Sequence, residues 1–570
     1  MTLRVRSLPV DPHRGSIPPE GAAPGSGSGP GVVPRNSAKE PAPGLLKARG
    51  MRADLIALLA GALAALALPP LHVLPVLLVS FPVLLAQINA ARGFFEAARR
   101  GWWFGFGYHL IGLYWITEAI LFEAARFWWF VPLAVPALGA VLALFIAIPA
   151  GVAWFVTRGR SRAGAAQVMA LGGGWVLGDL ARQFVGTGFP WNPLGTVWAV
   201  PGWFGDVMLQ PSSLVSVHGL TLATIVLACA PVLRWPGRTV CFAIFLAWIG
   251  FGISRVSAPL PPDQPLRVVL VQGNVPQGQK WDPALRDTVF ERYLHLTDEA
   301  VRAAGPGPLV VVWPETASPF LLDETARTAI STASHGEPVL AGAVRFDSDD
   351  RPRNSLFGIS GTGDVAAVYD KWHLVPFGEY QPSWAQIGIQ LVPGGGFASG
   401  PGPETLRIPG VPPVGPLICY EAIFPGQVVN EADRPTWMVN ATNDAWFGTS
   451  AGPRQHLAAA RLRAVEEGLP LLRAANTGIT AAFDARGHEI ARLGMEQAGF
   501  RTVQLPGALS RTIFGRFGLP LPGSLAAGVL IAGLAMGAWQ RRNESALTRS
   551  TKKDVRSRIL TRRAAIKPDA

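Results

Sequence analysis

Residues 128–156 read WWFVPLAVPALGAVLALFIAIPAGVAWFV, an apolar run without a charged side chain. At a rise of about 1.5 Å per residue, this run exceeds the roughly 30 Å of hydrocarbon in a bilayer. Lipid offers the backbone no hydrogen-bond partner, so each such span should be an α-helix. Further apolar runs of this kind occur at 54–69, 72–89, 103–122, 165–185, 212–233, 239–255 and 519–539. The sequence therefore predicts a polytopic α-helical membrane bundle of about eight spans.

The basic residues predict how these spans are oriented. Positive charge precedes the first span, follows the second, fourth and sixth spans, and fills the C-terminal tail. The loop cations are Arg92, Arg99, Arg100, Arg158, Arg160, Arg162, Arg234 and Arg238. The other loops hold few cations, chiefly Arg126 and Arg182. Because cytoplasmic loops carry the excess of Lys and Arg, both termini should be cytoplasmic, and residues 256–515 should face outward.

The net charge of +12 does not indicate a nucleic-acid partner, because much of it lies in the tails and short loops. Residues 1–52 are rich in Pro, Gly, Ser and Arg and lack apolar periodicity, which predicts a disordered cytoplasmic tail. The first apolar run begins too far from the N-terminus for a secretory signal peptide. We expect five parts: this tail, a seven-helix membrane domain (53–255), an outer domain (256–515), an eighth helix (516–540) and a basic cytoplasmic tail (541–570).

The outer segment has a different pattern, in which short β-branched runs are bounded by Gly and Pro. These runs are Leu266–Gln272, Leu309–Trp313, Pro338–Val344, Pro416–Tyr420 and Thr436–Ala441. Helical patterns at Asp282–Ala303 and Arg454–Glu467 lie between several of them. This alternation predicts an α/β or α+β domain with packed sheets.

Three polar motifs end or follow strands of this segment. They are Val310-Val-Val-Trp-Pro-Glu315, Tyr369-Asp-Lys371-Trp-His373-Leu-Val-Pro-Phe-Gly-Glu379 and Leu417-Ile-Cys419-Tyr420-Glu421. Each also has a plain structural explanation. Glu315 could be a loop or capping carboxylate, Lys371 could pair with Asp370, and Cys419 could be a buried structural thiol. The chain has three cysteines, which is an odd number and too few for a disulfide framework. Cys229 and Cys241 lie in apolar helical runs and should pack as small hydrophobes, which leaves Cys419 as a free thiol.

Taken together, Glu, Lys and Cys in this order resemble the nitrilase, or carbon–nitrogen hydrolase, superfamily, which implies an αββα sandwich. The resemblance covers about residues 266–506. It includes Gln272-Gly-Asn274, Lys280-Trp281, Asn440-Ala-Thr-Asn443-Asp444-Ala-Trp446-Phe447-Gly448 and Arg473-Ala-Ala-Asn476-Thr477-Gly478. A nitrilase-like domain between seven spans and a last one resembles the apolipoprotein N-acyltransferase family, as do Gly105-Phe-Gly107 and Thr187-Gly-Phe-Pro-Trp191. The chain departs from that family's pattern at Asp179, where many members carry Glu, and at Thr442, where Ser is usual.

The resemblance implies a role for each residue of the motifs. Glu315 would be the general base for the Cys419 nucleophile, and Lys371 would stabilise the oxyanion. Glu379 would be the family's second acidic residue, which helps to hold Lys371 and the intermediate. Tyr420 and Glu421 would flank the nucleophile and shape the pocket.

The resemblance also implies the substrates. A membrane phospholipid would donate its acyl chain to Cys419 as a thioester, and the N-terminal amine of a diacylglyceryl-cysteine lipoprotein would accept it. We expect no metal or nucleotide cofactor, a location in the bacterial plasma membrane, and a monomer. Trp191, Trp281 and Trp446 are candidate contacts near the pocket mouth, although interfacial anchoring or core packing would also explain them. Arg182 would meet a phosphate head group, or only mark the end of a helix.

Two other functions remain open at this stage. One is a membrane-tethered amidase or hydrolase of the same superfamily, because water and an amine attack the same thioester. The other is a non-catalytic receptor or transporter whose nitrilase-like domain only binds. The complete Glu–Lys–Cys set argues against the second, because a binding domain has no need of all three.

Overall fold

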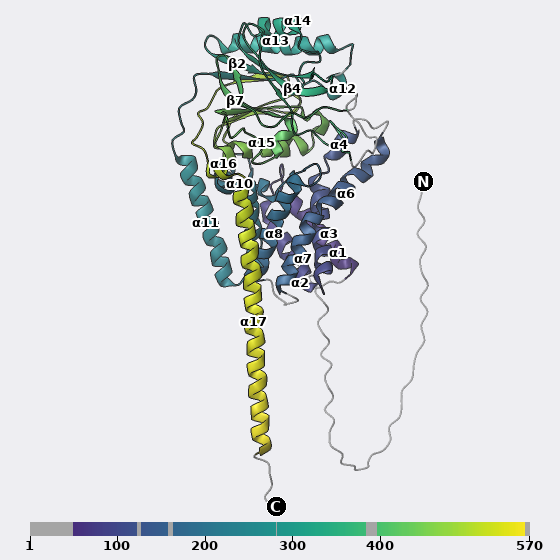
Figure 1. The fold of residues 1–570 in the computed structure, drawn as a ribbon, viewed down its shortest axis with the longest axis vertical. Helices are drawn as coiled ribbons and strands as arrows, with labels where there is room; N and C mark the ends of the chain where they lie inside the picture. Colours follow the sequence, from purple (N-terminus) through teal and green to yellow (C-terminus); the bar gives the residue numbers. More distant parts are fainter. Residues whose placement is uncertain (1–49, 122–126, 158–163, 281, 384–395, 565–570) are drawn as a thin grey trace, which may run out of the picture. The chain divides into compact units, whose positions relative to one another are not determined.

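Apolar helices form most of the N-terminal part of the protein (Figure 1). The computed structural model describes residues 50–121, 127–157, 164–280, 282–383 and 396–564. The N-terminal helices are α1 (Met51–Ala65), α2 (Leu77–Ala90), α3 (Phe94–Gly112), α4 (Ile116–Leu121), α6 (Val131–Leu142), α7 (Leu144–Thr157), α8 (Ala165–Phe184), α9 (Trp203–Leu209), α10 (Ser212–Ala228) and α11 (Trp235–Ser257). Each apolar run of the sequence overlaps at least one helix. The predicted N-terminal tail falls almost wholly outside the described residues.

Several of these helices have the length and composition of membrane spans. Within the described ranges, four segments qualify: Trp128–Thr157, Ser212–Val232, Trp235–Ser257 and Pro520–Ala546. Leu74–Ala90 is a shorter apolar helix. The protein is therefore an integral membrane protein, whereas the count of eight crossings stays a prediction.

Glycines allow the bundle helices to approach closely. A Cβ on Gly61 of α1 would lie 1.8 Å from the Phe104 carbonyl oxygen, and one on Gly107 of α3 would lie 2.1 Å from that of Leu58. Small residues at such contacts let two backbones pack against each other, which is how helices associate in lipid. The Gly105-Phe-Gly107 motif thus has a packing role in α3.

Two six-stranded sheets form the domain between α11 and the last helix. The first has the order β12-β1-β2-β3-β4-β5, with strands β1 (Arg267–Gln272), β2 (Leu309–Val312), β3 (Val339–Phe346), β4 (Pro352–Ile359), β5 (Val365–Asp370) and β12 (Gly499–Gln504). The second has the order β11-β10-β9-β8-β7-β6, with strands β6 (Leu406–Ile408), β7 (Val411–Ile418), β8 (Trp437–Thr442), β9 (Leu471–Ala475), β10 (Thr480–Phe483) and β11 (Glu489–Leu493). β1–β2–β3 and β7–β8–β9 pair in parallel. The strands predicted from the sequence are confirmed as β1, β2, β3, β7 and β8.

The sheets pack face to face and helices cover their outer faces, which confirms the αββα sandwich (Figure 1). Val268 and Val310 of the first sheet share one core with Ile418 and Val439 of the second. The alternate residues of the first sheet pack on α13 (Arg286–Ala304) and α14 (Glu324–Ala333). Those of the second sheet pack on α15 (Gly452–Glu467). Strands buried on both faces need continuous apolar runs, which is the pattern seen in the sequence.

Helix α15 also joins the sandwich to the membrane helices. The indole of Trp191 and the amide of Asn192 both donate to Gln455 Oε1, each at 2.9 Å. Inside α10 the backbone leaves helical geometry at Val215 and Ser216, where φ of Ser216 is 61°. Glu466 accepts from the hydroxyl of Ser216 and from the Val217 amide, both at 2.8 Å, and so caps the second half of α10. A carboxylate of the sandwich thus completes a helix of the bundle.

The last long helix, α17 (Pro520–Ala564), follows the short helix α16 (Ile513–Phe517). It packs on α8, where a Cβ on Gly173 would lie 2.5 Å from the Ala526 carbonyl oxygen. The helix continues beyond residue 540, into the segment that the sequence predicts to be a basic tail. The boundaries of these parts stay predictions.

Substitution of Gly61 tests the close packing of α1 on α3. We expect Gly61→Ala to destabilise the bundle by roughly 1–3 kcal/mol, because the added methyl group meets backbone and the helices must separate. Gly250→Ala in α11 is the matched control, since a Cβ there meets nothing within 4 Å. Thermal unfolding of the detergent-solubilised proteins measures the difference. Equal midpoints for the two variants would contradict this packing.

Candidate active site

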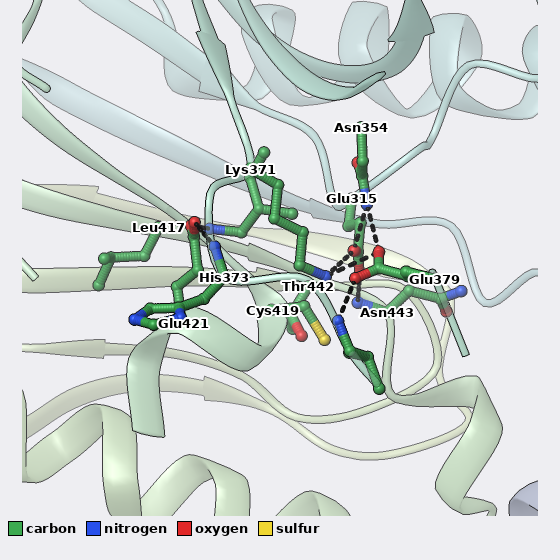
Figure 2. Close-up of polar contacts among 12 residues, drawn as sticks. Glu315, Asn354, Lys371, His373, Glu379, Leu417, Cys419, Glu421, Thr442 and Asn443 are labelled. Carbon is green, nitrogen blue, oxygen red and sulfur yellow. Dashed lines mark hydrogen bonds and ion pairs between the residues drawn. The ribbon is translucent and has the colours of Figure 1, made fainter. Parts of the chain in front are cut away.

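Glu315, Lys371 and Cys419 come together at the ends of strands from both sheets (Figure 2). The Lys371 ammonium lies 3.0 Å from Glu315 Oε1 and 2.9 Å from Glu379 Oε1. All three charged side chains are buried, and Lys371 is only 1% exposed. Figure 2 shows the amine between the two carboxylates, with the Cys419 side chain beside them. The residues that the sequence proposes as a set therefore form one cluster.

Amide groups complete the hydrogen bonding of the two carboxylates. Asn354 Nδ2 donates to Glu315 Oε1 at 2.7 Å and to Glu379 Oε1 at 3.0 Å. The backbone N–H of Asn443 donates to Glu315 Oε2 at 3.0 Å, and that of Val375 donates to Glu379 Oε2 at 2.8 Å. Buried charges are tolerated only when they are paired and hydrogen-bonded in this way.

The charges of the cluster shift each other's pKa. Burial alone would raise the pKa of Glu315, but the ammonium groups of Lys371 and Lys280 lower it below its ordinary value. Burial alone would lower the pKa of Lys371, but Glu315 and Glu379 raise it well above its ordinary value. Glu315 is therefore an ionised carboxylate beside a permanent cation at neutral pH.

Cys419 begins the 3₁₀ helix η6 (Cys419–Ile423) directly after β7. Its φ is 49°, in the left-handed region that side chains other than Gly rarely adopt. Burial and the Glu315 carboxylate raise the pKa of the thiol, and Lys371 offsets this only in part. The residue is thus a buried, un-ionised thiol on a strained turn, and a nearby base is needed to activate it.

Glu421 follows the nucleophile by two residues, and its hydrogen bonds join the two sheets. Its carboxylate accepts from the Ile418 amide at 2.6 Å, the Trp372 amide at 2.8 Å and the Tyr369 hydroxyl at 2.8 Å. Burial raises its pKa to about 7. The Cys419 turn is therefore held to the segment that carries Lys371. Next to it, the Tyr420 hydroxyl donates to the Gly188 carbonyl in the segment after α8, at 3.0 Å.

Three of the four candidate substrate contacts lie among the described residues. Trp191 is 3% exposed and packs on Trp115, with ring centroids 4.5 Å apart. Arg182 is also 3% exposed and pairs with Asp179 at 3.0 Å, inside α8. Trp446 is half-buried in the 3₁₀ helix η7 (Asp444–Phe447), and Trp281 lies outside the described residues. Contacts of these four residues with substrate stay predictions.

Sequence reasoning overlooked several residues of the cluster. Lys280 is buried, and its ammonium donates to the Glu315 carbonyl at 2.9 Å; burial lowers its pKa to about 8. Lys280 and Asn443 both lie in motifs that support the resemblance, so those motifs held a signal. No sequence motif singles out Asn354, because it is a lone amide residue inside β4.

One group of described residues has ligand atoms close enough to hold a metal ion: Cys419, Asp444 and His456, within 4.8 Å of one another. Both ring nitrogens of His456 are already engaged, one with Asp444 Oδ1 at 2.8 Å and one with the Cys419 carbonyl at 2.9 Å. Arg473 pairs with the other oxygen of Asp444 at 2.6 Å. The imidazole nitrogens and the Asp444 carboxylate are thus satisfied within the protein, so we interpret the group as a hydrogen-bond network.

The sandwich and its buried Glu–Lys–Cys cluster define a nitrilase-type domain carried by membrane helices. Family models agree with both parts: an "Apolipoprotein N-acyltransferase N-terminal domain" matches residues 60–230, and "Carbon-nitrogen hydrolase" matches residues 267–513. The chain is similar to the apolipoprotein N-acyltransferase of Rhodopseudomonas palustris, 38% identical over 86% of this chain and 95% of that protein. It is similar to that of Sinorhizobium medicae, 39% identical over 81% and 91%. The chain belongs to the apolipoprotein N-acyltransferase family.

Among solved structures, the chain is similar to Saccharomyces cerevisiae Nit3, a member of branch 10 of the nitrilase superfamily. The TM-score is 0.34 and the identity 18%, over 44% of this chain and 92% of that one.

The pH dependence of alkylation tests the state of the thiol. We expect the rate of Cys419 labelling by iodoacetamide to rise about tenfold per pH unit, without a plateau, to about pH 10, because the raised pKa keeps the thiolate a minor species. Mass spectrometry of the Cys419 peptide measures the rate. A plateau reached at or below about pH 10 would mean an ordinary or lowered pKa and would contradict this arrangement.

Proposed function

We propose that this chain transfers an acyl chain from a membrane phospholipid to the N-terminal amine of diacylglyceryl-cysteine lipoproteins, with Cys419 as the nucleophile. Family membership supports acyl transfer to lipoproteins. The observation that carries the residue assignment is the buried Lys371 ammonium, held between Glu315 and Glu379 beside a thiol on a strained turn. A domain that only binds has no need to bury these charges around a free thiol.

In the first half-reaction, Glu315 takes the proton of Cys419 while the sulfur attacks the ester carbonyl of the phospholipid. Lys371 stabilises the oxyanion that forms, a contribution of roughly 3 kcal/mol for a preorganised donor. Glu379 and Asn354 hold Lys371 and Glu315 in place. The C–O bond then breaks, and the alkoxide leaves with the proton from Glu315 as a lysophospholipid. Cys419 is left as a thioester.

In the second half-reaction, the lipoprotein amine attacks the thioester carbonyl. Glu315 accepts the proton that the amine loses, and Lys371 again stabilises the oxyanion. The C–S bond breaks, the thiolate recovers the proton from Glu315, and an amide is released. The scheme is ping-pong and uses one site for both substrates.

The membrane helices explain how such substrates reach the site. Both carry acyl chains, and each CH₂ moved from lipid into water costs about 0.8 kcal/mol. Helix α4 packs against η7 and against η3 (Trp128–Phe130). Trp128 is 69% exposed and Trp129 is 50% exposed, as expected of side chains at a membrane interface. We place the mouth of the pocket on this side, where Trp446 of η7 also lies.

The remaining parts of the proposal follow from charge and family. The protein lies in the bacterial plasma membrane with both termini in the cytoplasm and the sandwich on the outer face, in keeping with the positive-inside rule. It acts as a monomer, because all residues of the proposed mechanism come from one chain.

Acylation by a labelled phospholipid tests the residue assignment. In liposomes, we expect label on Cys419 as a thioester, no label on Cys419→Ala, and roughly 10²-fold slower labelling of Glu315→Gln, because that variant lacks the general base. Glu324→Gln, an exposed glutamate on α14, is the matched control and should label at the wild-type rate. Mass spectrometry of the Cys419 peptide follows the thioester. Folded wild-type protein without label would overturn the assignment.

The acceptor is tested by discharging that thioester. We expect a diacylated lipopeptide to remove the label from Cys419 and to appear as the N-acyl amide, much faster than water removes it. Mass spectrometry of the lipopeptide measures the product, and an N-acetylated lipopeptide is the control without a free amine. Discharge by water at the same rate with either peptide would instead favour a lipid hydrolase.

A further inference from the structure

A buried polar network lies behind Cys419, and the mechanism above does not use it. His456 and Arg473 are 0% exposed and Asp444 is 1% exposed. They come from three elements: α15, β9 and η7, which follows β8. Burying an ion pair and an imidazole costs free energy, so the arrangement needs an explanation beyond stability.

The network reaches the nucleophile through one hydrogen bond. His456 Nε2 lies 2.9 Å from the carbonyl oxygen of Cys419. A backbone carbonyl only accepts, so Nε2 carries the proton of this bond. The acceptor belongs to the residue whose φ is 49°. Fixing that carbonyl fixes the peptide plane that follows Cys419, and with it the direction of the Cα–Cβ bond from which the thiol projects.

The other edge of the ring is anchored to the second sheet. Nδ1 lies 2.8 Å from Asp444 Oδ1 and 3.2 Å from Arg473 Nη2. Arg473 also pairs with Asp444 Oδ2 at 2.6 Å and donates to Asn440 in β8. Burial opposes the charge of Asp444, but Arg473 and His456 lower its pKa to about 2. The carboxylate therefore stays ionised, and the plane of the imidazole is fixed by charged partners.

A residue of the membrane part covers the ring of His456. The Trp191 indole packs on the imidazole, with ring centroids 5.6 Å apart and planes inclined by 37°. Trp191 is held by Gln455, the residue before His456. The imidazole thus lies between the ion pair of the second sheet and the segment that follows α8.

We propose that His456 is a positioning residue for Cys419: it holds the nucleophile's carbonyl, and so the backbone and Cβ that carry the thiol, against the Asp444–Arg473 pair and the Trp191 ring. This inference rests on the proposed function, in which Cys419 attacks the phospholipid. It makes the geometry of the nucleophile depend on the membrane part of the chain as well as on the sandwich.

Two amide variants separate this role from a general structural one. In His456→Gln the side-chain amide can reach the position of Nε2 and donate to the Cys419 carbonyl. In His456→Asn the amide replaces Nδ1 near Asp444 but falls short of that carbonyl. We expect the single-turnover rate constant for Cys419 acylation to fall by roughly 10²-fold in His456→Asn, because a displacement of the reacting atom by about 1 Å has a cost of this order. In His456→Gln, which keeps the hydrogen bond, it should fall by less than about tenfold. The half-saturating phospholipid concentration and the unfolding temperature should be alike in both variants.

The outcomes keep the inference and the proposed function apart. Equal rate constants in Gln and Asn, or a loss that follows the unfolding temperature or the half-saturating concentration, would overturn the positioning role while leaving Cys419 as the nucleophile. Absence of a thioester in folded wild-type protein would overturn the proposed function itself.

If neither amide variant folds, Trp191→Phe and Trp191→Leu replace them. Phe keeps an aromatic ring against His456 and Leu does not, so acylation at saturating phospholipid should be slower in Trp191→Leu by about tenfold, with an unchanged half-saturating concentration, within the same cost of misplacement. Equal acylation in Phe and Leu would contradict the role of the packed ring.

Discussion

The buried ammonium of Lys371 constrains this structure more than any other group described. A cation inside a protein must be surrounded by opposite charge and hydrogen-bond acceptors, or it loses its proton. Glu315 and Glu379 supply that charge, and they follow different strands of the first sheet. Asn354 then bridges the two carboxylates from β4. The segments that carry Glu315, Asn354 and Glu379 must therefore meet around Lys371. Their meeting places a base and a cation side by side at the edge of the sandwich.

The second sheet supplies the reacting atom, and its support is equally polar. Cys419 adopts a left-handed conformation after β7; Glu421 accepts from the amide of the residue before it, and His456 bonds to its carbonyl. Helix α15, which carries His456, also caps α10 and binds the segment containing Trp191. The site is thus built by two sheets and braced by the membrane part. This bracing distinguishes it from a nitrilase domain that is merely tethered to a membrane.

Much of this arrangement could be predicted from the sequence, because periodicity and strand ends are local features. The apolar runs, the strands before Glu315 and Cys419, and the Glu–Lys–Cys set all follow from short motifs. Other contacts join residues far apart in sequence. They are the bond from Asn354 to Glu315, those from Tyr369 and Trp372 to Glu421, and that from His456 to Cys419. They depend on which strands pair and how the sheets pack, which no local pattern contains. Local hydropathy does not fix the number of spans either, because α3 and α8 hold buried charges such as Arg100 and Asp179 within the bundle.

The central claim is that the Lys371 ammonium and the Glu315 carboxylate act as one unit on Cys419. A double-mutant cycle in the rate of thioester formation measures this most directly, with Lys371→Met, Glu315→Gln and the double variant compared with wild type. If the two groups work as a unit, the double variant should be about as slow as the slower single variant, since either loss disables the pair. Losses that multiply in the double variant would show that the two groups act independently, and would contradict the account.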